Sequence, residues 1–154
     1  MSNHAAAIAI LSATTMMAMP AAGQTVSRLD LSEWVGEWKA SEEQSISVTM
    51  PDKKGLQFDG FATYGALDPE RVANGSVHVG EFSVRVPSSW ITVDNTISFA
   101  LGLDGEAVPP ETAGEFDCVL EMRLDWNINW IDVTDNRMCG GHNVSFTGQY
   151  EWVE

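Results

Sequence analysis

The stretch FDCVLEMRLD, residues 116–125, decides the fold class, because apolar and polar residues alternate along it one by one. A second stretch, VSFTGQYEW at residues 144–152, alternates in the same way. Successive side chains of a β-strand point to opposite faces of the sheet, so a period of two predicts strands with one buried and one exposed face. The sequence therefore predicts an all-β fold whose clearest strands lie late in the chain.

Weaker alternation extends this prediction toward the start of the chain. Further strands are expected at residues 36–40, 45–50, 56–59, 77–86, 91–93, 97–101 and 128–133. The apolar positions change phase across Gly80-Glu81, which indicates a β-bulge. Residues 91–93 and 97–101, separated by a short polar turn, indicate a hairpin. Short helical turns are expected only near residues 30–34 and 68–73.

The connections between the expected strands are short, which bears on the architecture. About eight antiparallel strands in meander order favour a lipocalin-like, calycin-type β-barrel, because a sheet that closes on itself leaves no exposed edge. A β-sandwich with Greek-key crossings would show the same alternation and is the alternative.

The first 23 residues have the composition of an export signal peptide. They contain alanine-rich and methionine-rich runs with no Asp, Glu, Lys or Arg, and they end in Ala21-Ala22-Gly23, which suits a signal peptidase. A buried N-terminal helix is the alternative. We expect residues 24–154 to form a single exported domain, periplasmic or extracellular, without a transmembrane segment. In an oxidising compartment Cys118 and Cys139 are expected to form a disulfide.

The chain is strongly acidic, with 22 Asp and Glu against 8 Lys and Arg and a net charge of −14. Nucleic acid is an unsuitable partner for such a chain, because phosphate binding needs a basic surface. The same charge favours solubility, or attraction to a cationic protein.

Two resemblances add to this interpretation. The segment Gly36-Glu37-Trp38 resembles the Gly-x-Trp opening of lipocalins, which implies a tryptophan plugging one end of a barrel and a cavity for a small apolar ligand. The pattern Cys-Gly-Gly-x-Asn-Val-Ser-Phe-x-Gly-x-Tyr at residues 139–150 resembles small exported bacterial proteins with no established activity. This second resemblance runs from about residue 34 to 152, departs from the pattern at His78 and at residues 126–130, and implies export, β-architecture and the disulfide.

The residues after the export signal contain no recognisable catalytic or cofactor motif. Only two histidines, His78 and His142, lie there. Cys139 and His142 would lack a second pair of ligands for a metal. We therefore predict a non-catalytic protein without cofactor or metal. An envelope enzyme is an alternative that would need polar side chains gathered around one of the imidazoles.

Six tryptophans are the other unusual feature of the composition. Two of them, Trp90 and Trp126, are expected at strand ends, where exposed aromatic side chains can anchor a partner. We predict that these two, Trp130 and the acidic loop at residues 104–115 form one contact surface, made of Trp90, Trp126, Trp130, Asp104, Glu106 and Glu111. The most specific hypothesis is an inhibitor of a cationic hydrolase such as lysozyme. A carrier of a small apolar ligand is the alternative.

Overall fold

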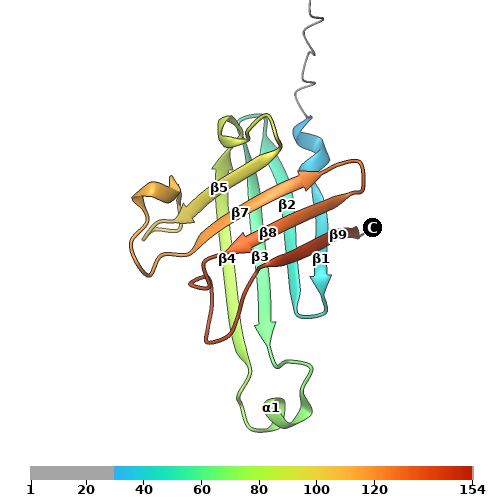
Figure 1. The fold of residues 1–154 in the computed structure, drawn as a ribbon, viewed down its shortest axis with the longest axis vertical. Coiled ribbons are helices and arrows are strands. Elements are labelled where there is room, and N and C mark those ends of the chain that lie inside the picture. The colour runs from blue at the N-terminus through green and yellow to red at the C-terminus, as the bar shows by residue number, and fades with distance from the viewer. Residues whose placement is uncertain (1–29, 154) are drawn as a thin grey trace, which may run out of the picture.

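The computed structural model describes residues 30–153, which confirm the all-β prediction (Figure 1). The predicted export signal lies outside these residues. The strands are β1 (Gly36–Ser41), β2 (Gln44–Asp52), β3 (Gly55–Tyr64), β4 (His78–Pro87), β5 (Thr96–Leu101), β6 (Ala107–Val108), β7 (Val119–Asp125), β8 (Trp130–Asp135) and β9 (Gly148–Val153). The short helices are η1 (Leu31–Trp34), α1 (Pro69–Ala73), η2 (Ser88–Trp90) and η3 (Pro110–Thr112). Within residues 30–153 no helix is long and apolar enough to cross a membrane.

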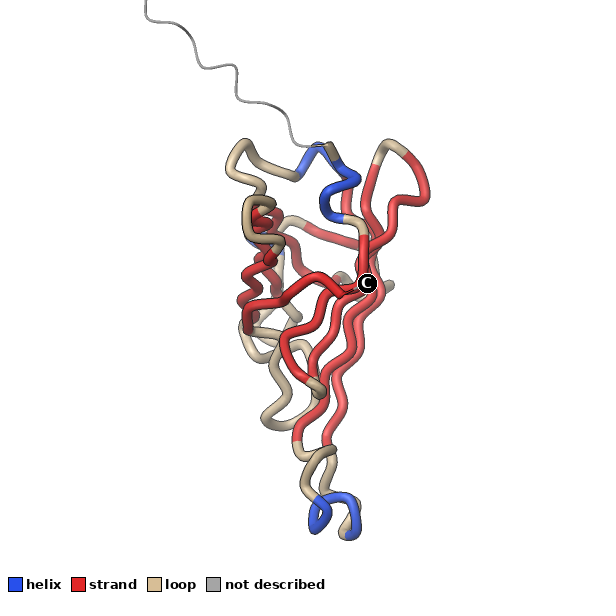
Figure 2. Tube along the Cα trace, turned by 90° about the vertical axis from the view of Figure 1, so that its right-hand side faces the viewer, coloured by secondary structure: helices blue, strands red, loops and turns tan. Residues whose placement is uncertain are grey.

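The strands of the described residues form one antiparallel sheet in the order β4-β3-β2-β1-β9-β8-β7-β5-β6. The long meander β1 to β4 makes one layer, and β5, β7, β8 and β9 cross it at a steep angle (Figure 1). The two layers join where β1 pairs with β9, and they enclose the core between them (Figure 2). The sheet curves into a nearly closed barrel. Closure is incomplete because its two edge strands, β4 and β6, are not hydrogen-bonded to each other. The barrel is one continuous sheet, whereas a sandwich would have two.

A chain of aromatic rings runs through the core and connects both layers. Trp34 of η1 meets Phe58 of β3 edge to face, with ring centroids 6.1 Å apart. Phe58 lies 5.9 Å from Phe99 of β5, which in turn lies 6.5 Å from Phe82 of β4. Phe82 and Phe146 are 4.8 Å apart. The predicted inward positions of the strands therefore meet in a single aromatic core.

The interior of the barrel is filled by side chains. Six large side chains of the inner face are 0% exposed, and a seventh, Phe82, is 5% exposed. The six are Phe58, Phe99, Leu120, Met122, Phe146 and Tyr150. A side chain that exposes no surface to water adjoins no void large enough to hold a water molecule, so no ligand cavity lies against these six.

The predicted β-bulge at Gly80-Glu81 is wrong. The register of β4 with β3 is unbroken from Tyr64↔His78 to Gly55↔Pro87. The apolar pattern changes phase there because Val79 points outward and is 47% exposed, while Gly80 takes the inward position. An exposed valine thus mimics the sequence signal of an extra residue.

The predicted strand at residues 91–93 is also wrong. This segment is a loop, turned by hydrogen bonds from Asn95 N to Thr92 O (3.1 Å) and from Thr92 N to Thr96 O (2.9 Å). Both predicted helical turns are present. Asp30 caps η1 by accepting from Ser32 N, and Asp68 caps α1 by accepting from the first amides of that helix.

The loop between β8 and β9, residues 136–147, closes one end of the barrel. The disulfide Cys118–Cys139 ties its start to the chain just before β7, which confirms the predicted bond. Gly141 N donates to Val79 O of β4 at 3.1 Å. A Cβ atom added to Gly80 would lie 2.9 Å from the Cα atom of Gly140, so the loop lies directly on the β4 backbone. The adjacent glycines after Cys139 therefore allow a close approach of two chain segments.

Candidate functional site

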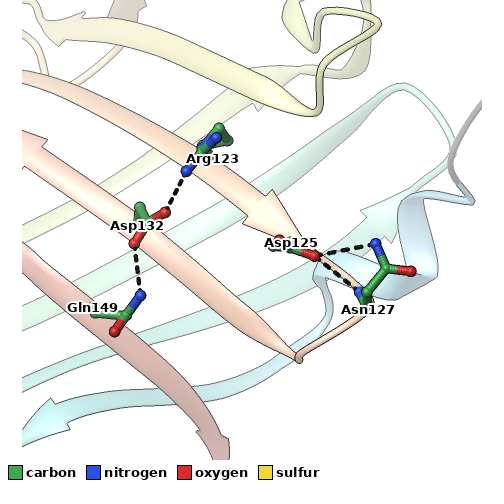
Figure 3. Close-up of polar contacts among 5 residues, drawn as sticks. All are labelled: Arg123, Asp125, Asn127, Asp132 and Gln149. Atoms are coloured by element: carbon green, nitrogen blue, oxygen red, sulfur yellow. Dashed lines mark hydrogen bonds and ion pairs between the residues drawn. The ribbon is translucent and has the colours of Figure 1, made fainter.

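The turn between β7 and β8 projects two large apolar side chains into solvent. Asp125 Oδ1 accepts from the backbone N and the side-chain Nδ2 of Asn127, at 3.1 and 3.3 Å (Figure 3). Asn129 has a positive φ of 52°, which helps the chain to reverse direction. The turn held in this way exposes Trp126 by 54% and Ile128 by 52%. A fixed turn with an apolar tip is a suitable anchor for a partner.

Two shallow depressions flank this turn. The first, of about 190 Å³, is lined by Asp94, Asn95, Arg123, Leu124, Asp125, Trp126 and Asn127. The second, of about 260 Å³, is lined by Ser32, Glu33, Val35, Trp38, Asn129 and Trp152. We refer to Trp126, Ile128 and these lining residues as the mouth surface. It combines η1, the loop before β5, the β7–β8 turn and the end of β9, which are far apart in the sequence.

The tryptophans beneath the second depression form a fixed floor. Trp38 is 2% exposed, and its indole Nε1 donates to Trp34 O at 2.9 Å. Trp152 lies against Gly36, where an added Cβ atom would meet the Trp152 ring nitrogen at 2.2 Å. Gly36 also has a φ of +152°, which side chains disfavour. Gly36 is therefore needed to seat Trp152, which stays 44% exposed.

The mouth surface carries negative charge that nearby cations do not neutralise. Arg123 Nη2 donates to Asp132 Oδ2 at 2.7 Å, and Gln149 Nε2 donates to Asp132 Oδ1 at 3.2 Å (Figure 3). The hydrogen bond and the charge of Asp132, followed by a smaller contribution from the charge of Asp125, raise the pKa of Arg123, and the ion pair itself is formed with Asp132. Within residues 30–153 no ion pair involves the acids of the mouth surface, which are Glu33, Asp94 and Asp125.

The six residues predicted to form one contact surface lie in different places. Trp126 belongs to the mouth surface, and Trp130 lies half-buried on the outer face between Asp125 and Glu151. Trp90 is packed against the core from η2, so it closes the barrel.

The acidic loop is remote from the β7–β8 turn. The ladder of β5 with β7 runs from Thr96↔Arg123, beside that turn, to Ala100↔Val119. The loop that carries Asp104, Glu106 and Glu111 follows the second end of this ladder. The six residues of β5 separate the two regions by about 17 Å. The structure therefore does not bring the acidic loop to Trp126.

Other members of the mouth surface were not predicted from the sequence. The sequence pattern predicts Ile128 in a strand and Asp94 in a hairpin turn. The alternation predicts that Trp152 faces inward. It does lie on the inner face of β9, opposite the buried Trp38, but it is beyond the end of the core and is therefore exposed. An apolar residue between two asparagines, as in Asn127-Ile128-Asn129, is the sequence signal that could have indicated an exposed apolar turn.

The two histidines meet near the start of β4, away from the mouth surface. The rings of His78 and His142 are 5.9 Å apart, and Tyr64 lies 6.4 Å from His78. Arg71 stacks over the Tyr64 ring at 4.7 Å. Among residues 30–153 no group of three or more His, Cys, Asp or Glu side chains could hold a metal ion. The neighbours of His78 are thus aromatic rings, and no reaction is suggested by them.

No family model, curated protein sequence or solved structure matches this chain. The function is therefore inferred from the chain's own residues.

Proposed function

We propose that this protein is an exported, non-catalytic binding module that contacts a cationic protein through the mouth surface. The observation that carries the proposal is the pair of half-exposed side chains Trp126 and Ile128 at the tip of the β7–β8 turn. Large apolar side chains at the tip of a fixed turn gain free energy when a partner removes them from water. The disulfide Cys118–Cys139 fits an oxidising, exported compartment.

The charge around the turn supports a cationic partner. Acidic side chains without intramolecular ion pairs surround the apolar tip, and the whole chain carries a net charge of −14. Such a field attracts a basic protein over a distance of about 10 Å at 0.1 M salt and raises the association rate. A projecting turn also suits a concave site on the partner. The most specific form of the proposal is inhibition of a cationic hydrolase such as lysozyme.

The filled interior argues against a carrier of small apolar ligands. The inner-face side chains leave no room beside them, and the depressions of about 190 and 260 Å³ are open surface features. Pockets that hold small ligands are usually about 300–1,000 Å³. An envelope enzyme likewise has no supporting geometry among the described residues.

Binding to lysozyme, measured by titration calorimetry and by inhibition of cell-wall hydrolysis, tests the proposal. The double variant Trp126→Ala/Ile128→Ser is expected to weaken binding about 30-fold or more, because an anchor of this kind contributes about 2 kcal/mol or more. Leu103→Ser is the matched control, because Leu103 is 100% exposed and lies outside the mouth surface. Glu33→Gln/Asp94→Asn is expected to slow association and to reduce its salt dependence.

Two results would contradict the proposal. One is wild-type affinity in the Trp126→Ala/Ile128→Ser variant for every cationic protein that the wild type binds. The other is affinity for such a protein that does not change between low and high salt. If lysozyme does not bind, but another basic protein does so in the expected variant-dependent and salt-dependent way, only the hydrolase part of the proposal is lost.

A further inference from the structure

Strand β4 is a long edge strand without the usual protection. It ends the sheet, it is ten residues long, and its register with β3 is continuous. It contains no lysine, and its proline, Pro87, is its last residue. The other edge, β6, is only two residues long. Natural edge strands are usually short, bulged, or interrupted by lysine or proline, because an unpaired edge invites another strand.

The hydrogen bonds around β4 show which backbone groups are free. Ser88 N donates to Lys54 O, at the end of the β3 ladder, whereas Val79 O accepts from Gly141 N on the opposite side. The N–H and C=O of one residue in an antiparallel strand point to the same side, and successive residues alternate. The odd-numbered residues of β4 therefore face the open edge.

Beyond Val79 no backbone group within residues 30–153 is hydrogen-bonded to this edge, although β6 approaches β4. Glu81, Ser83 and Arg85 present their N–H and C=O groups there, and within residues 30–153 no hydrogen bond is made to them. Their side chains are exposed on the outer face. The free stretch from residue 81 to 85 is long enough for a short antiparallel ladder.

The side chains along this stretch are complementary to a second copy of themselves. A two-fold axis through Ser83 places Glu81 of one copy opposite Arg85 of the other, and Ser83 opposite Ser83. All of these are edge-facing residues, so they would exchange backbone hydrogen bonds in an unstrained register. Opposite charges facing each other across strands are stabilising. Arg85 already contacts Asp52 of its own chain, but its side chain is still 49% exposed.

We infer that β4 pairs with β4 of a second copy, so that two barrels share one continuous sheet across a two-fold axis. This inference is independent of the proposed function, because the mouth surface is built from η1, the loop before β5, the β7–β8 turn and β9. The net charge of −14 on each copy opposes association at low salt. Salt therefore strengthens this dimer, whereas it weakens binding to a cationic partner.

Sedimentation velocity of the purified protein, over a concentration series at low and high salt, tests the inference. The wild type is expected to form a dimer that tightens with salt. Ser83→Pro is expected to be monomeric, because proline removes the central edge-facing N–H and leaves the β3 ladder intact. Ser83→Ala is the matched control: it also loses the hydroxyl that donates to Asp59, but it keeps the N–H and is expected to dimerise.

Charge reversal gives a second test that does not depend on proline. Glu81→Arg and Arg85→Glu, each alone, place like charges opposite each other and are expected to weaken the dimer about ten-fold. A mixture of the two variants is expected to form a heterodimer, because opposite charges then face each other again. The inference is overturned by a wild type that stays monomeric at every concentration and salt. A dimer that persists in Ser83→Pro, or a mixture that associates no better than its components, would overturn it too.

Discussion

Single polar side chains hold the end of the barrel where the β8–β9 loop folds over the core. The Tyr150 hydroxyl, on a side chain with no exposed surface, donates to Phe146 O at 2.9 Å. Asp135 Oδ1 accepts from the hydroxyls of Ser145 and Thr147, both at 2.7 Å, and its Oδ2 accepts from Phe146 N at 3.1 Å. These contacts replace the strand pairing that the loop lacks.

Tyr150→Phe is expected to lower the free energy of unfolding by about 1 kcal/mol near neutral pH, the usual net contribution of a hydrogen bond. Burial, and then the charge of Asp135, raise the pKa of Tyr150 above its ordinary value of 10.0. The unfolded state therefore loses this proton first, so the wild type loses stability as the pH rises above 10. Phenylalanine cannot titrate, so the difference between the two proteins should shrink. Urea unfolding between pH 7 and 11 measures it; a difference independent of pH would contradict the prediction.

Asp135→Ala is expected to lower the free energy of unfolding by about 1.5–3 kcal/mol, because it leaves the partly buried amide of Phe146 and two hydroxyls without their acceptor. Asp132→Ala is the control. Asp132 pairs with Arg123 on the exposed outer face, where solvent screening leaves an ion pair only a small contribution to stability. Chemical unfolding of both variants at neutral pH compares the two losses. Equal losses would show that the contacts of Asp135 do not secure the loop.

At the scale of elements, sequence periodicity predicted burial better than it predicted hydrogen bonding. Alternation through residues 144–152 placed Val144, Phe146 and Tyr150 inward, and all three are buried. The strand itself begins only at Gly148, because the Asp135 carboxylate takes the Phe146 amide that a neighbouring strand would otherwise bind. Periodicity reports which side chains face the core, but it does not report what satisfies the backbone.

The candidate site was predictable only in part, for a related reason. Trp126 was recognised because it follows a strand, and a strand end is a local property of the sequence. Its neighbours in the mouth surface, such as Trp152 and Glu33, come from the two ends of the described chain and meet only after the sheet folds back. For the same reason the sequence could not show that β5 separates Asp104 from Trp126.

The disulfide gives a prediction for the β8–β9 loop. The double variant Cys118→Ala/Cys139→Ala is expected to unfold with a free energy about 3 kcal/mol lower, because a bond spanning 21 residues restricts the unfolded chain. Equilibrium unfolding in urea measures the loss. A reducing agent should destabilise the wild type by a similar amount and leave the variant unchanged. An effect of the reductant on the variant would point to a different cause.

At the scale of the whole molecule, the largest feature visible in the sequence is the net charge of −14. Sodium chloride is expected to increase the free energy of unfolding between low and moderate ionic strength, because it screens repulsion among the acidic groups. Thermal or urea unfolding at neutral pH measures this change. Potassium chloride should act equally, since screening does not depend on the cation. A stability that falls with added salt would mean that attractive surface ion pairs outweigh the repulsion.

The sequence pattern limited the architecture to a barrel or a sandwich, but it did not predict which strands pair to close the barrel. Short connections and strand number favoured a barrel, and the structure is a single sheet that nearly closes. The position of the remaining gap depends on β4 and β6 being the two strands that approach each other without hydrogen-bonded pairing, which no local pattern specifies. The pairing of β1 with β9 cannot be predicted from local sequence patterns either, because it joins residues more than a hundred positions apart.

That pairing also sets the order in which the barrel can form. β1 lies at the start of the described chain and β9 at its end, so the seam between the two layers cannot form until almost all of this chain is available. Contacts between such distant residues are slow to form because a long loop must close first. While the chain is being synthesised from its N-terminus, β1 has only β2 beside it, although the meander from β1 to β4 pairs between sequence neighbours. The seam between the layers is therefore the last part of the barrel to close, and until β9 is available the second edge of β1 is unpaired.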